Sequence, residues 1–213
     1  MGRVISSKND IVIIGFGGHA RSVADSICGL GEYNVLGYTD KCDCDINYTY
    51  MGDDSILPNL YNDGLRHVVI GVGYLGKSRL RDELVDYAKK IGFDFPTIID
   101  KSAVLARDIQ IGEGCYVGKR AVINSGSVVG DFCIINTGSI LEHENHIGDY
   151  SHISVASVLC GDVSVGCHSF VGASSTVIQG KIIGNNCVIG AHSTVLSDVE
   201  DNLTVYGVVK GWK

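Results

Sequence analysis

Aliphatic residues recur at every sixth position across the second half of the chain without interruption. The members of this column are Ile99, Leu105, Ile111, Val117, Ile123, Val129, Ile135, Leu141, Ile147, Ile153, Leu159, Val165, Val171, Val177, Ile183, Ile189 and Val195. A period of six matches neither the turn of an α-helix nor a heptad, so either structure would spread the column around its circumference. Repeats of six residues are typical of parallel β-helices. We therefore predict short strands joined by corners, with the column stacked inside.

Small residues accompany this column in the same phase. Four places after the aliphatic residue stands a mostly small side chain, as at Ala103, Ala121, Ser127, Ser139, Ser151 and Ser193. In this pattern the chain resembles the left-handed β-helix acyltransferases, in which three hexads form one triangular coil. The resemblance implies between about five and six coils. Each coil should lie about 4.8 Å above the last, because neighbouring strands pair at that spacing.

The first hundred residues lack the repeat and show the alternation of an α/β domain instead. Ile11–Ile14 is a short apolar run of the kind found in buried parallel strands, and it leads directly into the glycine-rich stretch 15–20. Val23, Ile27 and Leu30 follow at helical spacing, with a glycine after them as a stop signal. Strand, glycine turn and helix in this order predict a Rossmann-like unit.

Further strand and helix signals follow along this part of the chain. Val35–Tyr38 predicts a second strand, Tyr48–Met51 a weaker one, and Val68–Val72 a clear strand that ends in glycines. The apolar spacing over residues 77–91 predicts a helix with charges on its other face. These elements complete a small α/β domain.

The predicted boundary between the two domains lies just before the first coil. Leu80, Leu84 and Ala88 share one face of the last predicted helix, and we expect that face to be buried. The chain then leads into the repeat. We assign residues 1–95 to the Rossmann-like domain and residues 96–213 to the β-helix with a cap at its end. Leu203–Gly207 is the stretch that we expect to add a capping strand, because an open β-helix exposes an edge.

Charge and hydropathy limit the partners. The formal net charge is −7 and no basic run occurs, which argues against nucleic acid or an anionic membrane. No apolar run approaches the length of a membrane span, and the start of the chain shows no signal-peptide pattern. We therefore expect a cytoplasmic protein without membrane insertion that binds a small molecule.

The eight cysteines do not form a recognisable disulfide or zinc motif. Cys115, Cys133 and Cys187 fall on the small position of the repeat, where a thiol serves as a small apolar group. No CxxC occurs, and the spacing of Cys42 and Cys44 does not suit a zinc knuckle. We expect reduced, structural thiols.

The glycine turn is the first candidate site. Gly15, Gly17 and Ala20 match the dinucleotide fingerprint, and Asp40 lies about where a ribose-binding acid is expected. Glycines let the backbone approach a phosphate at a helix N-terminus, where free N–H groups favour anions. His19 lies where such a phosphate would sit. A tight turn without ligand stays an alternative, and so small a domain would hold one nucleotide more easily than two.

The second candidate site is the acidic and imidazole-rich stretch 142–146, followed by His152. A neutral imidazole can take a proton from an attacking amine or hydroxyl, which makes His143 a candidate general base. Neighbouring side chains of a strand point to opposite sides, so Glu144 would assist His143 only if the pair straddles a corner. A solvated polar corner is the alternative.

Zinc binding is the other possibility for these histidines. The γ-class carbonic anhydrases, another left-handed β-helix family, bind zinc through three histidines. That resemblance would require a His-x4-His pair, and none occurs here. Catalytic zinc needs three convergent ligands and an open position. We predict no metal.

Taken together, the two stretches resemble the NeuD/PglD type of sugar O- and N-acetyltransferases over nearly the whole chain. The residues that carry the resemblance are Gly15-Phe16-Gly17-Gly18-His19, Leu141-Glu142-His143-Glu144 and Ile147-Gly148-Asp149-Tyr150-Ser151-His152. The resemblance implies an acetyl-CoA-dependent transferase that forms homotrimers, with the acyl donor in the groove between adjacent prisms.

Residue roles in the β-helix follow from this resemblance alone. It implies His143 as general base and Glu144 as the residue that tunes it. It further implies that Asn136 positions the substrate, that His152 contacts acetyl-CoA, and that Gly161 lets the pantetheine arm lie close to the coil.

In the small domain the resemblance implies a nucleotide-sugar site. Gly17, Gly18 and His19 would contact the diphosphate, Asp40 the nucleoside, and Gly73 would form the wall of the pocket at a strand end.

Two departures from the family are present. Its members tend to finish in a Gly-x-Pro-Ala turn that helps cover the cofactor, whereas the stretch Gly207 to Trp212 contains no proline. Lys41 follows Asp40, where the family often shows paired acids. The departures concern binding contacts and leave the chemistry of His143 untouched.

The sequence thus predicts an N-acetyltransferase that acts on the amino group of a nucleotide-linked sugar such as a UDP-4-amino-4,6-dideoxysugar. The amine would attack the thioester directly, with His143 as base. O-acetylation of sialic acid or another sugar is one alternative. A trimeric binding protein without turnover is the other.

Overall fold

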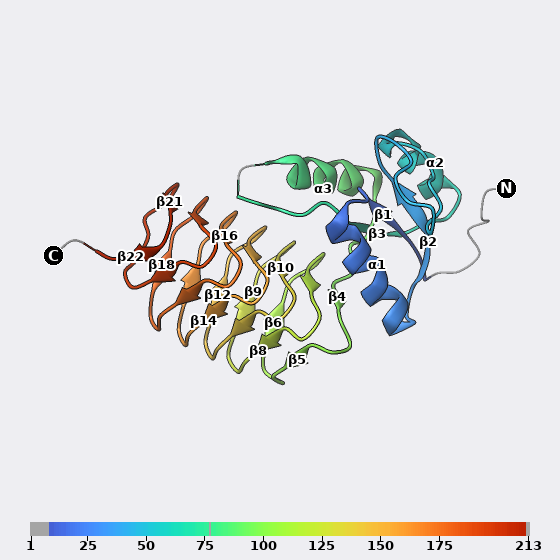
Figure 1. Cartoon of the computed structure of the whole chain (residues 1–213). Helices are drawn as coiled ribbons and strands as arrows, with labels where there is room; N and C mark the ends of the chain where they lie inside the picture. Colours follow the sequence, from blue (N-terminus) through green and yellow to red (C-terminus); the bar gives the residue numbers. More distant parts are fainter. Residues whose placement is uncertain (1–8, 77, 212–213) are drawn as a thin grey trace. The chain divides into compact units, whose positions relative to one another are not determined.

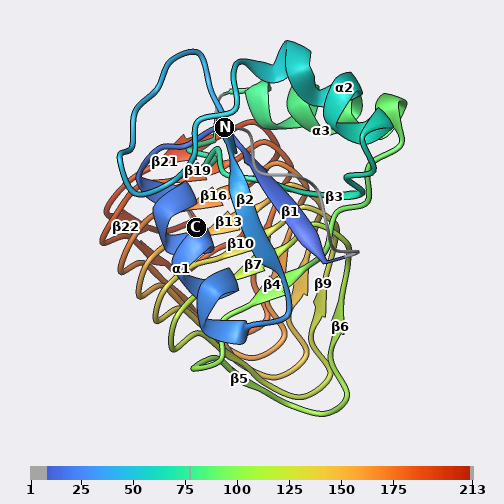
Figure 2. The same ribbon diagram turned by 90° about the vertical axis from the view of Figure 1, so that its right-hand side faces the viewer.

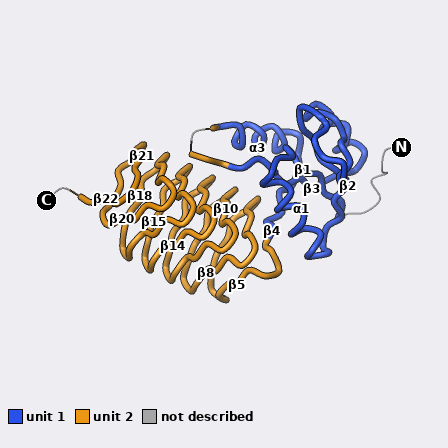
Figure 3. The backbone as a smooth tube through the Cα atoms, in the orientation of Figure 1, with its two compact units in different colours: residues 1–73, 79–98 blue, residues 74–78, 99–213 orange. Residues whose placement is uncertain are grey.

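The computed structural model describes residues 9–76 and 78–211. The described residues form two compact units (Figure 3). One contains the chain up to Gly73 together with Arg79–Ile98, and the other contains Tyr74–Ser78 and the chain from Ile99 onward. Trp212, the last residue of the C-terminal stretch that differs from the family pattern, lies outside the described residues. The predicted α/β domain followed by a hexapeptide-repeat β-helix is confirmed.

The first unit is built on a three-stranded parallel sheet of order β2-β1-β3 (Figure 1). Its strands are β1 (Asp10–Ile14), β2 (Asn34–Thr39) and β3 (His67–Ile70). Its helices are α1 (Gly18–Leu30), the 3₁₀ turn η1 (Asp54–Ile56), α2 (Leu57–Asn62) and α3 (Leu80–Ile91). Every residue of β1 is buried, as the continuous apolar run predicts for a central parallel strand.

Some sequence predictions for this unit were wrong in detail. Residues 48–51 form no strand, because only Tyr50 makes a single bridge to Tyr38. The stretch before α3 was predicted as helical from residue 77, but the helix begins at Leu80. The short helix α2 was missed, since its six residues are too few to show a period.

The buried face of α3 agrees with the predicted one at Ala88 but not at Leu80. Arg81, Val85 and Ala88 are its buried residues, whereas Leu80 is 42% exposed. The reason is polar: Arg81 donates hydrogen bonds to the carbonyl oxygens of Ile70 at 3.2 Å and Val72 at 2.7 Å. The buried guanidinium thus satisfies two carbonyls at and just after the end of β3.

The second unit is a parallel β-helix of two-residue strands on three sheets (Figure 1). Sheet 1 contains β4 (Ile98–Ile99), β7 (Tyr116–Val117), β10 (Ile134–Ile135), β13 (His152–Ile153), β16 (Phe170–Val171), β19 (Val188–Ile189) and β21 (Thr204–Val205). Sheet 2 contains β5 (Val104–Leu105), β8 (Val122–Ile123), β11 (Ile140–Leu141), β14 (Val158–Leu159), β17 (Thr176–Val177), β20 (Thr194–Val195) and β22 (Val208–Val209). Sheet 3 contains β6 (Gln110–Ile111), β9 (Val128–Val129), β12 (His146–Ile147), β15 (Ser164–Val165) and β18 (Ile182–Ile183).

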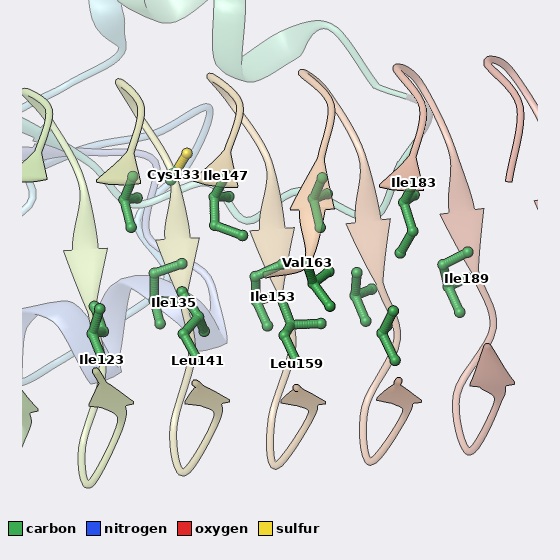
Figure 4. Packing of buried hydrophobic residues seen from close by; sticks show 14 of the residues in the cluster. Ile123, Cys133, Ile135, Leu141, Ile147, Ile153, Leu159, Val163, Ile183 and Ile189 are labelled. Atoms are coloured by element: carbon green, nitrogen blue, oxygen red, sulfur yellow. The ribbon is translucent and has the colours of Figure 1, made fainter. Parts of the chain in front are cut away.

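Each coil repeats the last after eighteen residues, as shown by the pairing of Ile134 with His152 (152 − 134 = 18). Seen along the stack, the coils lie behind one another (Figure 2). The second residue of each strand points inward and belongs to the core, as Figure 4 shows for Ile135, Ile153 and Ile189. The aliphatic column of the sequence is therefore the core of the β-helix.

The small residues of the repeat form a hydrogen-bonded ladder at the corners. The Ser151 hydroxyl donates to the carbonyl of Gly166 at 2.7 Å and accepts from the amide of Ser169 at 3.0 Å. Ser157, Ser169 and Ser175 make the same kind of donation, each to the carbonyl 15 residues further along the chain. Small polar residues thus satisfy backbone groups that the corners leave without strand partners.

The corners also carry non-glycine residues with positive φ, such as Phe132 (56°), Glu144 (60°) and Tyr150 (58°). This backbone costs roughly 1–2 kcal/mol for a residue with a Cβ atom. The amides of these residues donate to the coil before, as Glu144 does to the Ser125 carbonyl at 2.9 Å. Bonds between coils therefore hold each corner in place.

The end of the β-helix is capped as the sequence predicts and by one strand more. Thr204–Val205 forms β21 on sheet 1, within the stretch expected to add a strand. Val208–Val209 adds β22 to sheet 2 and was not predicted.

All eight cysteines lie in the described part of the chain as free thiols. Cys115, Cys133 and Cys187 are buried in the core, where burial raises the pKa of the Cys133 thiol well above its ordinary value. In the described ranges, no helix combines the length and apolarity needed to span a bilayer.

The two residues of β18, Ile182 and Ile183, provide a matched test of this fold. Ile183 is fully buried in the core, whereas Ile182 points outward and is 56% exposed. We expect Ile183→Ala to lower the free energy of unfolding by about 2–5 kcal/mol, because it removes core contacts and leaves a cavity. Ile182→Ala should cost about 0.5 kcal/mol or less. Urea-induced unfolding measures both, and equal costs would contradict the assignment of the two faces.

Candidate functional site

The first unit contains a pocket of about 260 Å³ at the carboxyl ends of β1 and β3. Its lining residues are Gly15, Phe16, Gly17, Gly18, His19, Asp40, Lys41, Asp54, Gly71, Val72, Gly73, Leu80 and Leu84. The chain leaves β1 toward β2 on one side and reaches β3 on the other, so this is the switch point of the sheet. Ligands of open α/β sheets bind at such a point.

The turn after β1 opens helix α1 toward this pocket. Gly17 is the N-cap of α1 and supplies no side-chain hydrogen bond, and the first turn contains no acidic residue. A Cβ atom at Gly17 or Gly18 would meet nothing within 4 Å. The backbone amides and the positive end of the helix dipole therefore face open space, which suits an anionic group.

The backbone and its neighbours restrict residue 15 to glycine more strongly than residue 73. Gly15 has φ 79°, and a Cβ atom there would overlap the side chain of Val72. At Gly73 a Cβ atom would lie 3.7 Å from the Cβ atom of His19, an ordinary contact. Gly15 is thus required by the turn itself, while Gly73 borders the pocket beside His19.

Asp40 lies in the pocket, and its carboxylate also holds the turn together. One oxygen accepts the Phe16 amide at 2.7 Å and the other accepts the Lys41 amide at 2.6 Å. Asp54, a lining residue that the sequence did not single out, accepts a hydrogen bond from the Thr39 hydroxyl at 2.6 Å. Two acids and Lys41 therefore set the charge of this wall.

The loop after β2 is anchored by the Tyr38 hydroxyl, which is buried beside the pocket's Phe16 ring at 4.2 Å between centroids. This hydroxyl donates to Asp43 at 2.7 Å and accepts the amides of Cys44 at 2.8 Å and Asp45 at 3.0 Å. Burial, followed by the Asp43 hydrogen bond, raises the pKa of Tyr38 to about 12. One phenol thus orders the loop that carries Asp40 and Lys41.

In the second unit, His143 and Glu144 lie at the corner between β11 and β12. Glu144 has positive φ, so the pair straddles the corner. This is the arrangement that Glu144 needs in order to assist His143. His143 Nδ1 and Glu144 Oε2 are 3.1 Å apart. A carboxylate only accepts, so Nδ1 carries the proton and Nε2 keeps its lone pair. Both side chains are more than half exposed.

Gly161 lies directly beside the His143 imidazole. A Cβ atom at this position would overlap Cε1 and Nε2 of the ring. Residue 161 is one coil after residue 143, since Asp162 donates its amide to the His143 carbonyl at 2.9 Å. The glycine therefore gives room to the imidazole itself, which the sequence did not indicate.

Asn136 and His152 form a second group on sheet 1. His152 is buried, its Nδ1 lies 2.6 Å from the Tyr74 carbonyl and its Nε2 lies 3.0 Å from Asn136 Nδ2. Asn136 Oδ1 accepts the Thr137 amide at 2.8 Å, which identifies Nδ2 as the nitrogen that faces His152. His152 Nδ1 therefore donates to Tyr74, and Nε2 accepts from Asn136.

The predicted residues thus fall into three groups in the described structure. Gly17, Gly18, His19, Asp40 and Gly73 share the pocket of the first unit. The second unit holds the other two groups. His143, Glu144 and Gly161 meet at one corner, and Asn136 and His152 lie on sheet 1. Among the described residues, no set of three or more His, Cys, Asp and Glu side chains is arranged to hold a metal ion.

Both halves of the chain match known family models. Residues 10–103 match the PglD N-terminal domain. Residues 108–142 and 162–197 match the hexapeptide repeat of succinyl-transferase. No curated protein matches the chain.

Solved structures match over nearly the whole chain. PerB from Caulobacter crescentus, in complex with CoA and GDP-perosamine, is 36% identical, with 94% of this chain and 97% of PerB covered and a TM-score of 0.88. The acetyltransferase domain of PglB from Neisseria gonorrhoeae, in complex with acetyl coenzyme A, is 27% identical, with 94% and 97% covered and a TM-score of 0.87. WeeI from Acinetobacter baumannii, 20% identical with 92% and 96% covered, has a TM-score of 0.81 and supports the fold alone.

The glycine turn provides a test within one stretch. Gly15→Ala should lower the free energy of unfolding by about 1–3 kcal/mol, because the positive φ and the contact with Val72 both oppose a Cβ atom. Gly18→Ala should leave it unchanged or raise it by up to about 1 kcal/mol, because alanine favours the first turn of α1. Urea-induced unfolding measures both. A Gly18→Ala protein as unstable as Gly15→Ala would contradict this geometry.

Proposed function

The chain belongs to the NeuD/PglD type of sugar acetyltransferases, and on this premise we propose that it transfers an acetyl group from acetyl-CoA to the amino group of a nucleotide-linked sugar. The observation that carries the proposal is the match to PerB at 36% identity over 94% of this chain. The related structures are described as complexes with CoA or acetyl coenzyme A. PerB is described as a perosamine N-acetyltransferase, which favours an amine over a hydroxyl as acceptor.

His143 is the residue to which we assign the general base. Its Nδ1–H is held by Glu144, so Nε2 is free to accept a proton from the attacking amine. The new C–N bond forms at the thioester carbonyl and the C–S bond breaks, with CoA leaving as the thiol after it gains a proton. The Glu144 carboxylate favours the charge that His143 gains during the step.

The second group on sheet 1, together with Gly161 beside His143, is assigned to binding. His152 with Gly161 would contact acetyl-CoA, and Asn136 would position the acceptor. Because Tyr74 and Asn136 engage both ring nitrogens of His152, this imidazole is fixed in one tautomer and orientation. Such an imidazole suits the placement of a ligand better than the transfer of a proton.

We assign the nucleotide diphosphate to the N-terminus of α1 in the first unit. Gly17, Gly18 and His19 would meet the phosphates, Gly73 would border them, and Asp40 would contact the nucleoside. The uncapped helix end supports this assignment. PerB binds a GDP-linked sugar, so guanosine joins uridine and thymidine among the nucleosides to be tested.

A homotrimer in the cytoplasm completes the proposal. His143 lies at a corner and His152 on sheet 1, and neighbouring copies would bring a corner and a sheet face together around the donor. Sheet 2 supports such contacts, since its outward residues are β-branched, including Val104, which is 62% exposed. Eight free thiols support a reducing compartment.

The decisive experiment compares wild type with His143→Ala on acetyl-CoA and a panel of GDP-, UDP- and TDP-linked amino sugars, with sialic acid alongside. We expect an N-acetylated product from one amino sugar, detected by mass spectrometry, and a rate about 10²–10⁴-fold lower in the variant. His192→Ala, which replaces another exposed histidine at a corner of the β-helix, is the control. Product from sialic acid alone would move the function to O-acetylation. An unchanged rate in His143→Ala would exclude His143 as the general base.

A second prediction tests the assignment of the acceptor to the first unit. Gly18→Ala adds a methyl group where the nucleotide diphosphate is expected. We expect a KM for the nucleotide sugar about tenfold higher and a KM for acetyl-CoA within about twofold of wild type. Steady-state kinetics with each substrate varied in turn measures both, and a change in the acetyl-CoA KM alone would contradict the assignment.

A further inference from the structure

Asn145 is the one residue with a side-chain amide at the repeat position that most hexads fill with a small side chain. It stands four places after Leu141, at the corner position where the neighbouring coils carry Ser127 and Val163. The full set of residues at this position is Ala103, Ile109, Cys115, Ala121, Ser127, Cys133, Ser139, Asn145, Ser151, Ser157, Val163, Ser169, Ser175, Lys181, Cys187, Ser193 and Val199. Asn145 is fully buried.

The side-chain amide of Asn145 bonds to backbone on two coils. Nδ2 donates to the carbonyls of Glu142 at 2.5 Å and Cys160 at 3.0 Å, and it lies 3.3 Å from the carbonyl of His143. A serine at this position has one proton and makes one such donation, as Ser151 does. The amide therefore links groups that a serine cannot hold together.

This arrangement has a cost that packing does not explain. Asn145 Oδ1 is buried and accepts no hydrogen bond from any described residue. An unsatisfied buried acceptor costs about 1–3 kcal/mol, and a serine or cysteine at the same position avoids it. Such a group in a native protein calls for an explanation in function.

The three carbonyls belong to the backbone next to the candidate base. Two of them belong to Glu142 and His143, which form the corner itself. The third belongs to Cys160, the residue before the glycine beside which the imidazole lies. Asn145 therefore fixes both the backbone that carries the ring and the backbone that the ring rests against.

We propose that Asn145 is a positioning residue that holds the His143 imidazole in its orientation beside Gly161 and Glu144. Asn145 does not touch the substrate, since it lies inside the β-helix and acts through the backbone of the corner. The inference rests on the proposed role of His143 in acetyl transfer. A displacement of about 1 Å in a catalytic group can cost about 100-fold in rate, so small movements of this corner matter.

The test uses substitutions that the repeat already accepts at this position. Asn145→Ser and Asn145→Cys copy Ser127 and Cys133, and both remove the unsatisfied oxygen. We expect kcat to fall about 10–100-fold and both KM values to stay within about twofold. Ser175→Ala is the matched control, because its hydroxyl makes the equivalent bond to Gly190 two coils away from His143, and its kcat should stay within about twofold.

A second readout follows the imidazole directly. In protein labelled with ¹⁵N-histidine, the His143 signals are identified by their loss in His143→Ala. Wild type should show the proton on Nδ1, and both Asn145 variants should show a mixture of tautomers as the bond to Glu144 weakens. A residue with a structural role alone would change thermal unfolding without changing these signals.

The outcomes separate the two proposals. Wild-type kcat and unchanged His143 signals in both variants would overturn the role of Asn145. A loss confined to KM, or variants that fail to fold, would overturn it as well, because either shows a different role for the amide. If wild type acetylates no substrate, the proposed function fails, and the imidazole signals still decide whether Asn145 orients His143.

Discussion

Parallel pairing between coils is the interaction on which the structure depends. Each strand contributes only two residues, so no coil has a sheet of its own, and each finds its hydrogen bonds eighteen residues away. The aliphatic column supplies the core, while serine hydroxyls and the amides of the strained corners satisfy the remaining backbone groups. A corner such as that of His143 and Glu144 is held by the coils on either side of it. This is what allows two exposed side chains to keep a fixed relation.

The same logic separates what the sequence reveals from what it hides. The column from Ile99 onward, the burial of β1 and the capping strand at Thr204 were predictable, because a fixed period or an apolar run specifies which face is covered. The burial of Arg81 on α3 was not predictable, because its guanidinium donates to carbonyls that no sequence pattern displays. The 48–51 stretch has the residue types of a strand, but it pairs with β2 through a single bridge and forms no run of strand hydrogen bonds.

For the candidate site, the sequence shows the types of the catalytic and binding residues but not which side chains and backbone groups they contact in the folded protein. The crowding of acid and imidazole drew attention to His143 and Glu144, and the corner geometry brings them within 3.1 Å. The space that Gly161 leaves for the imidazole and the Tyr74 partner of His152 arise from contacts between distant positions. Asn145 had a signal in its departure from the serines and cysteines at its position, but its meaning required the three carbonyls.

The segment Tyr74–Ser78 interrupts the simple order of two consecutive domains along the chain. It is encoded between two elements of the α/β unit, β3 and α3, yet it belongs to the compact unit of the β-helix. There the Tyr74 hydroxyl donates to the His168 carbonyl, and its carbonyl accepts from His152. A recombination event or an engineered cut at the apparent domain boundary would therefore separate His152 from its partner while leaving every coil intact. No single cut in the chain therefore divides it into its two compact units.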